Sequence, residues 1–147
     1  MDELNTIFIK LSILLIVIVS LETNVTSVKV IIINDIQPNP SPTGSIPLYL
    51  HCKSKDNDLG FHTLGIFGQS YQFSFNPSFP VIKTTLFFCS FAWPESSLHH
   101  YLDIYDYDRD SCTECIWKIN KNGGSMFGVF HPWKSIGLMD RNSTSMV

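Results

Sequence analysis

The sequence has no excess of basic residues, and it has few charged residues of either sign. Its 10 Lys and Arg against 13 Asp and Glu give a net charge of −3. Proteins that bind nucleic acid or anionic membranes carry basic patches, so this balance argues against both as partners. Charged residues make up 16% of the chain and apolar residues 44%, which excludes disorder by composition and allows a buried core. The 147 residues suffice for one domain.

The chain also lacks an apolar segment of membrane-spanning length. Residues 11–21 form an apolar stretch of only eleven residues, whereas a membrane-spanning helix needs about 20. The stretch is typical of a secretory signal peptide, and Val25 and Ser27 suit the −3 and −1 positions of a cleavage site. Cleavage after Thr23 and an uncleaved anchor are the alternatives. We predict a signal peptide over residues 1–27 and a secreted, extracellular mature protein without stable membrane insertion.

No recognisable catalytic or metal-binding motif is present. The sequence has no GxSxG motif, and we predict that the protein is not an enzyme. The acids at Asp56 and Asp58, and those in residues 106–110, lack the Gly and Glu that complete an EF-hand calcium loop. We interpret them as solvated loop acids or as ion-pair partners of Arg109, and we expect no metal and no cofactor. We interpret the histidines as surface or strand-edge residues: His51, His62, His99, His100 and His131.

Short segments of strand character, separated by turn residues, make up most of the chain. The 11 Phe and the aromatic share of 13% favour strands. Leu48–Lys53 alternates between apolar and polar residues, and Thr84–Trp93 is apolar on both faces, which predicts a central strand. We predict an all-β, antiparallel β-sandwich of about eight short strands at residues 28–130, followed by a flexible tail at 131–147. The expected strands are residues 28–34, 48–53, 61–67, 71–75, 84–93, 100–107, 115–120 and 126–130.

Four cysteines behind a predicted signal peptide imply two disulfides. Three pairings are possible. A Cys112–Cys115 bridge would be a CxxC of the redox type, which usually opens a helix, whereas Cys115 here begins a strand pattern. We therefore expect Cys112 and Cys115 each to staple a different strand, and we prefer Cys52–Cys115 with Cys89–Cys112. A zinc site is the less favoured alternative, because the chain has no second CxxC.

Four segments follow one another in a distinctive order. They are HCKSKDNDLG at 51–60, YQFSF at 71–75, TLFFCSFAW at 85–93 and YDYDRDSCTECIW at 105–117. The set resembles the plant self-incompatibility S1 family, also called the S-protein homologues, over about residues 28–130. The resemblance implies a small secreted plant protein with a disulfide-stapled β-sandwich. In poppy, members of this family act as the stigma's self-recognition signal and bind a transmembrane receptor of pollen.

The resemblance implies an extracellular recognition or signalling ligand for a cell-surface protein such as a transmembrane receptor, with rejection of self pollen in self-incompatibility as a setting for that role. A rigid sandwich presents its loops for contact, so we expect the recognition surface on loops Ser54–Asp58 and Tyr107–Ser111. We expect a monomer that is N-glycosylated at Asn142, the first residue of an Asn-Ser-Thr acceptor. The candidate contact residues are Ser54, Lys55, Asp56, Asn57, Asp58, Tyr107, Asp108, Arg109 and Asp110.

Two other functions fit the sequence less well. A cell-wall carbohydrate-binding module would stack sugars on exposed rings such as Tyr101, Tyr105 and Trp133, but we expect these rings to pack in the core or on a sheet face. A secreted hydrolase or inhibitor is the third possibility. We further expect Trp117 to share a buried strand face with Cys115, because the two residues are separated by the two-residue period of a strand.

Overall fold

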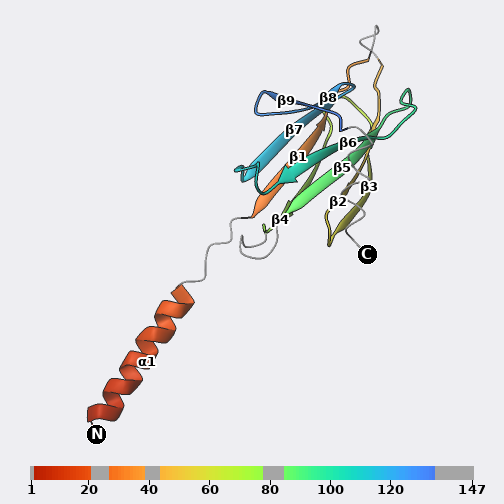
Figure 1. Ribbon diagram of the computed structural model, residues 1–147. Helices are drawn as coiled ribbons and strands as arrows, with labels where there is room; N and C mark the ends of the chain where they lie inside the picture. Colours follow the sequence, from red (N-terminus) through yellow and green to blue (C-terminus); the bar gives the residue numbers. More distant parts are fainter. Residues whose placement is uncertain (1, 21–26, 39–43, 78–84, 135–147) are drawn as a thin grey trace.

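The computed structural model describes residues 2–20, 27–38, 44–77 and 85–134. Within these ranges, helix α1 (Asp2–Ser20) is followed by nine strands in two sheets packed face to face (Figure 1). Sheet A has the order β4-β1-β7-β8-β9, and sheet B has the order β3-β2-β5-β6. The predicted all-β sandwich is therefore confirmed. The strands are β1 (Val28–Asn34), β2 (Leu48–Lys53), β3 (Asp58–Leu64), β4 (Ser70–Phe75), β5 (Leu86–Ala92), β6 (His100–Asp106), β7 (Glu114–Asn120), β8 (Gly123–Met126) and β9 (Val129–Pro132).

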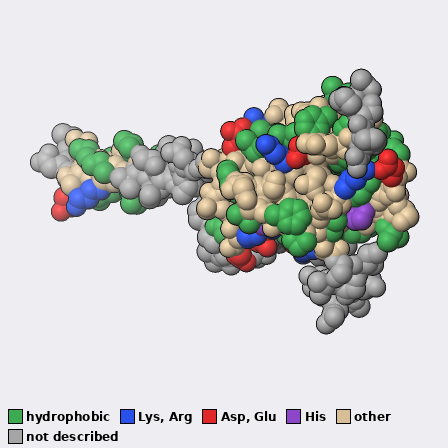
Figure 2. All heavy atoms as spheres, turned by 90° about the horizontal axis from the view of Figure 1, so that it is seen from above, with side chains coloured by type: hydrophobic (Ala, Val, Ile, Leu, Met, Phe, Trp, Pro, Cys, Tyr) green, Lys and Arg blue, Asp and Glu red, His purple; other side chains and the backbone are tan. Residues whose placement is uncertain are grey.

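Helix α1 contains most of the apolar stretch that we interpret as a signal peptide. Its sequence has no glycine or proline and is rich in Leu and Ile, so nothing interrupts the helix. Between residues 4 and 16 its large apolar side chains are all more than half exposed, and Figure 2 shows apolar side chains along the surface of the helix. None of the helical segments that the structure describes is long and apolar enough to cross a membrane. The signal peptide and its cleavage position remain predictions.

Strand alternation places the core where the sequence predicts it. In β2, Leu48, Leu50 and Cys52 are buried while Tyr49 is exposed. In β7, every second residue is buried from Cys115 onward, and these residues face the same core. The predicted buried face of β7 is confirmed: Cys115, Trp117 and Ile119 are each 0% exposed.

Strand pairing is antiparallel except at one place in sheet A. Strands β1 and β7 run parallel, with Val30 opposite Cys115 and Ile32 opposite Trp117. In sheet B, β5 lies between β2 and β6, which confirms the central position predicted for this apolar segment. Only one face of β5 lies in the core: Phe87, Cys89 and Phe91 are buried, and the residues between them are partly accessible, as is usual in an antiparallel sheet.

The third strand begins earlier than the sequence analysis expects. We expected a strand at residues 61–67, whereas β3 is Asp58–Leu64. A tight turn explains the shift, because the Ser54 amide donates to the Asn57 carbonyl at 2.8 Å and brings the chain back beside β2. Asp58 therefore belongs to a strand, and the loop that we expected to end at Asp58 ends at Asn57.

The expected strand at 126–130 is instead a hairpin of two strands, β8 and β9. Phe127 and Gly128 form its turn with φ values of +50° and +80°, both positive as in a type I′ hairpin turn. Strand β9 continues to Pro132, and the Lys134 amide donates to the Tyr101 carbonyl at 2.9 Å. Residues 131–134, which we assigned to the tail, thus connect the edge of sheet A to β6 of sheet B. Residues 135–147, including the predicted glycosylation site Asn142, lie outside the described residues.

The disulfide pairing that we preferred is wrong. Cys52 is bonded to Cys89, and Cys112 to Cys115. Cys52 and Cys89 lie directly opposite each other on β2 and β5, with Cα atoms 4.0 Å apart. Cys112 lies in the loop before β7, so its bridge to Cys115 needs no helix, and the two Cα atoms are 5.5 Å apart. The expectation failed because strand order, which decides which cysteines are neighbours, could not be obtained from the sequence.

A buried asparagine links the two sheets at the end of β1. Asn34 is 0% exposed, and its side-chain amide donates to the carbonyls of Ile46 at 2.8 Å and Leu64 at 3.0 Å. Its side-chain oxygen accepts the Ile36 amide proton at 3.0 Å. Both amide hydrogens and the carbonyl oxygen of the Asn34 side chain thus have hydrogen-bond partners, as a buried amide requires. No feature of the sequence marks this residue in advance.

Candidate recognition surface

The turn between β2 and β3 presents three exposed residues, Lys55, Asp56 and Asn57. In addition to the backbone hydrogen bond from Ser54 to Asn57, the Ser54 hydroxyl accepts the Asn57 amide proton at 3.1 Å. Such side-chain bonds to the backbone fix a turn locally. The preceding strand is held by the Cys52–Cys89 bridge, so the charged residues project from a rigid base.

Asp58 closes this turn from the first position of β3. Its carboxylate lies 2.5 Å from His51 Nε2 and 3.0 Å from Lys53 Nζ. The same carboxylate accepts the Gly60 amide proton at 3.0 Å. These partners, His51 first, hold the pKa of Asp58 well below its ordinary value. Asp58, which we predicted as a contact residue, therefore also stabilises the base of the turn.

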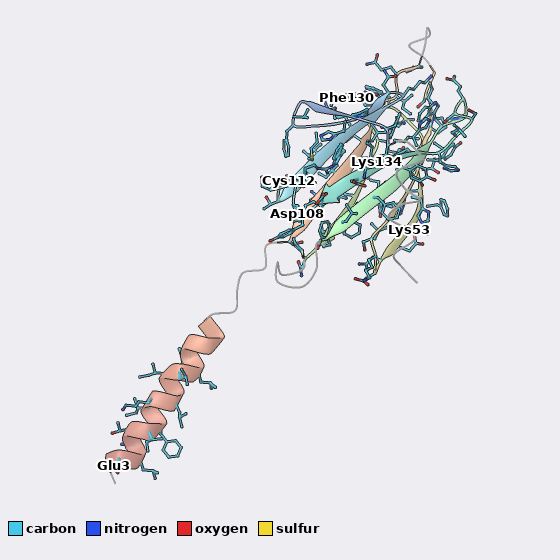
Figure 3. All side chains as sticks on the ribbon, viewed as in Figure 1. Glu3, Lys53, Asp108, Cys112, Phe130 and Lys134 are labelled. Carbon is cyan, nitrogen blue, oxygen red and sulfur yellow. A yellow bond between two sulfur atoms is a disulfide. The ribbon has the colours of Figure 1, made fainter. Side chains whose placement is uncertain are left out.

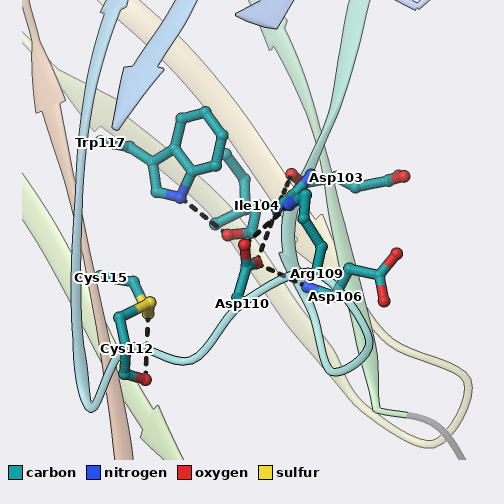
Figure 4. The surroundings of a disulfide bond; sticks show 8 residues. All are labelled: Asp103, Ile104, Asp106, Arg109, Asp110, Cys112, Cys115 and Trp117. Atoms are coloured by element: carbon teal, nitrogen blue, oxygen red, sulfur yellow. Dashed lines mark hydrogen bonds and ion pairs between the residues drawn. A yellow bond between two sulfur atoms is a disulfide. The ribbon is translucent and has the colours of Figure 1, made fainter. Parts of the chain in front are cut away.

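The second predicted loop follows β6 and is held by a buried acid (Figure 4). The Asp110 side chain is only 2% exposed, and it accepts two bonds from the Arg109 guanidinium, each 2.7 Å long. Asp110 also accepts the Asp106 amide proton at 2.8 Å. The hydrogen bond that Arg109 donates to Asp110 is the main reason that the pKa of the Arg109 guanidinium is raised. The predicted interaction of the loop acids with Arg109 is confirmed for Asp110.

Arg109 also covers the central tryptophan of β7. Its guanidinium carbon lies 5.6 Å from the centre of the Trp117 ring, within the range of a cation–π contact. One guanidinium nitrogen donates to the Asp103 carbonyl at 3.0 Å. Arg109 and Asp110 are thus engaged within the fold, and Tyr107 and Asp108 are the members of the predicted loop set that are left for contact.

The two predicted loops leave the same end of sheet B but do not form one cluster. Lys53, at the end of β2, lies opposite Phe88 of β5, and Asp106, at the end of β6, lies opposite Leu86. Strand β5 therefore separates them. In Figure 3, Lys53 lies on one side of the sandwich and Asp108 on the other. The two loops thus flank β5 at this end of the sheet, and their role in recognition remains a prediction.

The aromatic residues weighed for sugar binding are mostly packed inside. Tyr105 is 3% exposed, and burial is the main cause that raises the pKa of its hydroxyl. Trp133 packs against Phe91 and Trp93, with ring centres 5.6 Å and 6.2 Å apart. The expectation that these rings pack in the core is confirmed for Tyr105 and Trp133.

Two histidines have polar side-chain partners but no catalytic arrangement with them. His51 pairs with Asp58, as described above. His100 lies 3.0 Å from the Ser96 hydroxyl, but that hydroxyl donates its proton to the Leu98 carbonyl at 2.6 Å. Among the residues that the structure describes, no group of three or more His, Cys, Asp or Glu side chains could hold a metal ion.

An apolar hairpin tip is the surface feature that the sequence analysis missed. Phe127, Val129 and Phe130 are 69%, 59% and 51% exposed. The segment Met126–Phe130 was predicted as a strand paired to its neighbour, which placed these side chains on a sheet instead of around a turn. The Phe-Gly pair at 127–128 was the available indication, because Gly is preferred at the second position of a type I′ turn.

Fold and surface together define the class: a two-disulfide β-sandwich with charged turns at one end of a sheet. The chain belongs to the plant self-incompatibility S1 family, because the family model described as "Plant self-incompatibility protein S1" matches residues 29–135. This confirms the resemblance that the sequence segments indicated. The match continues to residue 135, which agrees with the extension of the domain beyond Phe130 by strand β9.

Relatives from Arabidopsis thaliana support the same assignment. S-protein homolog 5 is 45% identical over 96 residues, which cover 62% of this chain and 71% of the relative. S-protein homolog 2 is 42% identical over 102 residues, or 60% of each chain, so the match spans less than two thirds of that relative. S-protein homolog 29 is 33% identical over 145 residues, which cover 90% of this chain and 99% of the relative. No solved structure matches this chain.

Proposed function

We propose that this protein is a secreted recognition ligand that binds a protein partner on the plant cell surface. Membership of the self-incompatibility S1 family supports a recognition role, and the family's name suggests pollen–pistil recognition as the setting in which to seek the partner. The observation that carries the proposal is the exposed, charged β2–β3 turn on a rigid, disulfide-held base. Charged contacts of this kind set partner choice and encounter rate more than raw affinity.

Secretion is the first part of the proposal to test. Two disulfides require an oxidising compartment, which agrees with a signal peptide at residues 1–27. The protein recovered from the medium of expressing plant cells should begin at Val28, or at Asn24 if cleavage follows Thr23. Mass spectrometry of its N-terminal peptide measures this directly, and retention of residues 1–20 in the recovered protein would contradict the signal peptide.

The binding role is tested by changing the turn without disturbing its base. We would replace Lys55 and Asp56 with Ala and leave Asp58 unchanged, since Asp58 holds His51 and Lys53. Saturable binding of the labelled protein to plant plasma-membrane vesicles should weaken at least tenfold, while the thermal unfolding temperature stays within about 2 °C. Trypsin treatment of the vesicles should remove the binding of the wild type, because the proposed partner is a protein.

A matched control removes one base and one acid elsewhere. Lys121 and Glu95 form a salt bridge with each other at 2.5 Å, away from the turn, so their joint replacement by Ala changes charge in the same way and leaves neither partner unpaired. This control should bind like the wild type. Equal binding by the Lys55→Ala, Asp56→Ala variant and the wild type would show that the turn is a soluble connection only.

A further inference from the structure

The β8–β9 hairpin exposes more apolar surface than its own fold requires. Phe127, Val129 and Phe130 are three large apolar residues within four positions, and each is more than half exposed. Exposed apolar residues that stand alone are common, but a contiguous group of them marks a contact site. The hairpin also lies at the edge of sheet A, where a partner can approach it (Figure 1).

Phe127 occupies a backbone conformation that does not favour it. Its φ of +50° lies in the left-handed region, which Asn and Gly adopt readily and a bulky aromatic residue does not. Its side chain is 69% exposed, so little burial within the chain offsets that cost. An exposed aromatic residue at such a position points to a contact with another molecule.

The hairpin adjoins the loop after β6 through two residues that contact Trp117. His131 follows Phe130, and its ring centre lies 5.0 Å from the Trp117 ring. Arg109 lies over the same indole at 5.6 Å. The apolar hairpin and the acidic loop therefore fit within one interface of ordinary size, about 800 Å² per partner.

This combined surface carries a net negative charge beside its apolar tip, because Asp106 and Asp108 outnumber Lys118, an exposed base of β7 in line with Ser125 and Phe130. Arg109 is neutralised by Asp110. Asp106 and Asp108 form no salt bridge with any residue in the described ranges. Burial, with a further contribution from Arg109, lowers the pKa of His131, so His131 adds no positive charge near neutral pH. A complementary partner is apolar at its centre and basic at its rim.

Two other occupants fit this surface less well. In a two-fold dimer both sides of the contact would carry the same net negative surface, which is electrostatically unfavourable. Pro132 lacks an amide hydrogen, so β9 can extend a sheet by few hydrogen bonds. Anionic lipid is repelled by the Asp106 and Asp108 carboxylates. We propose that the β8–β9 hairpin inserts Phe127 and Phe130 into an apolar cleft of a partner protein, whose Lys or Arg side chains border that cleft and pair with Asp106 and Asp108.

This inference rests on the proposed binding to a cell-surface protein, and it assigns the apolar part of that contact to Phe127 and Phe130. The decisive variant is Phe127→Asn, since Asn suits a left-handed backbone. If Phe127 serves the fold, the variant unfolds at a lower temperature. If it serves binding, the variant unfolds at the same or a higher temperature and binds plant plasma-membrane vesicles at least tenfold more weakly. We expect the second result, with trypsin-treated vesicles as the blank.

Two further variants test the apolar tip and the charge separately. Leu98→Asn is the apolar control, because Leu98 is 58% exposed and lies in the loop before β6, at the opposite end of that strand from Asp108. It should bind like the wild type. Asp108→Lys should weaken binding at least tenfold and reduce the dependence of the affinity on salt, because a carboxylate that pairs with a basic rim is lost.

The possible outcomes separate the inference from the function on which it rests. Without saturable, trypsin-sensitive binding by the wild type, both are refuted. Binding that survives Phe127→Asn but is lost in the Lys55→Ala, Asp56→Ala variant refutes the hairpin alone. Stronger binding by Asp108→Lys refutes the basic rim. A dimer in analytical ultracentrifugation that Phe127→Asn abolishes would assign the hairpin to a second copy. Binding to protein-free phosphatidylcholine–phosphatidylserine vesicles would assign it to lipid. Either result overturns the proposal.

Discussion

Two buried polar side chains connect the sheets at the scale of single residues. Trp117 of sheet A donates its indole hydrogen to the Ile104 carbonyl of sheet B at 2.7 Å. Asn34 makes the corresponding link from β1 to Leu64 of β3 and to Ile46. Apolar contact brings two sheet faces together without direction, whereas these bonds fix how the faces are placed.

Replacing Trp117 with Ala should destabilise the fold by about 3–5 kcal/mol, as is usual for truncating a fully buried aromatic residue. Trp117→Phe keeps most of the ring but leaves the Ile104 carbonyl without its donor, so we expect a smaller loss of about 1–3 kcal/mol. Chemical denaturation of the three proteins measures both values. A loss below about 1 kcal/mol for Trp117→Ala would contradict the packing of β7.

These two residues differ in how far the sequence predicts them. The burial of Trp117 follows from its place two residues after Cys115 in a strand pattern. Asn34 ends an apolar run and is followed by Asp35, a pattern that equally suits a surface turn. Its burial depends on the carbonyls of Ile46 and Leu64, which come close only after both sheets have formed. Contacts of that kind are not encoded in local pattern.

At the scale of elements, strand β8 lies so close to β9 and to the core that Gly123 and Gly124 leave no room for a side chain. A Cβ atom on Gly124 would lie 3.0 Å from Trp117 Cε3 and 2.8 Å from Leu102 Cδ1. A Cβ atom on Gly123 would lie 2.2 Å from the His131 carbonyl oxygen of β9. The Gly123-Gly124 pair thus allows β8 to lie against β9 on one side and against the core on the other.

We predict that Gly123→Ala destabilises the fold by about 1–3 kcal/mol, the usual cost of an overpacked site, because the clashing atom belongs to backbone. Gly65→Ala is the matched control. The nearest atom to its added Cβ is 3.8 Å away, and we expect a change within about 0.5 kcal/mol. Thermal unfolding of both variants measures the difference. Equal stability of the two would mean that β8 and β9 lie farther apart than described.

The sequence predicts elements better than it predicts their connections. The bounds of β1 and β2 agree with the expected ranges because β1 is a run of β-branched residues that ends at Asn34, and β2 alternates between apolar and polar residues. The start of β3 was missed because Asp58 has the composition of a loop residue, although its carboxylate is held by His51 and Lys53. Of the candidate surface, the charged turns could be predicted, but the internal bonds of Asp58 and Asp110 could not.

At the scale of the whole molecule, two histidines make stability depend on pH. Burial lowers the pKa of both His100 and His131 from the ordinary value of 6.5. The unfolded chain therefore binds protons more readily, so the free energy of unfolding should fall as pH decreases through about 6.5. The lowered pKa of Asp58 adds a loss only below its ordinary value of 3.8.

Denaturation measured between pH 7.5 and pH 5 should show this loss of stability. His131→Gln removes one of the two groups, so the slope of the free energy of unfolding against pH should be shallower than in the wild type. His100→Gln removes the other group and should make the slope shallower as well. An unchanged slope in His131→Gln would show that the proton is not taken up at His131.

The two disulfides should contribute unequally to the stability of the whole chain. Cys52–Cys89 joins positions 37 apart, and Cys112–Cys115 joins positions only 3 apart. Loop-closure entropy gives about 4 kcal/mol for the first bridge and about 2 kcal/mol for the second. The long bridge also joins two residues that are each 0% exposed, so its removal disturbs the core as well.

We predict that replacing Cys52 and Cys89 together by Ala lowers the free energy of unfolding by about 4 kcal/mol, and that the same change at Cys112 and Cys115 lowers it by about 2 kcal/mol. The physical reason is that the long bridge excludes many more conformations of the unfolded chain. Denaturation under non-reducing conditions measures both losses, after peptide mapping has verified the remaining bridge in each variant. If the loss at Cys112 and Cys115 were the larger, the short bridge would act by holding the Arg109–Asp110 loop over Trp117, and chain entropy would not be its main contribution.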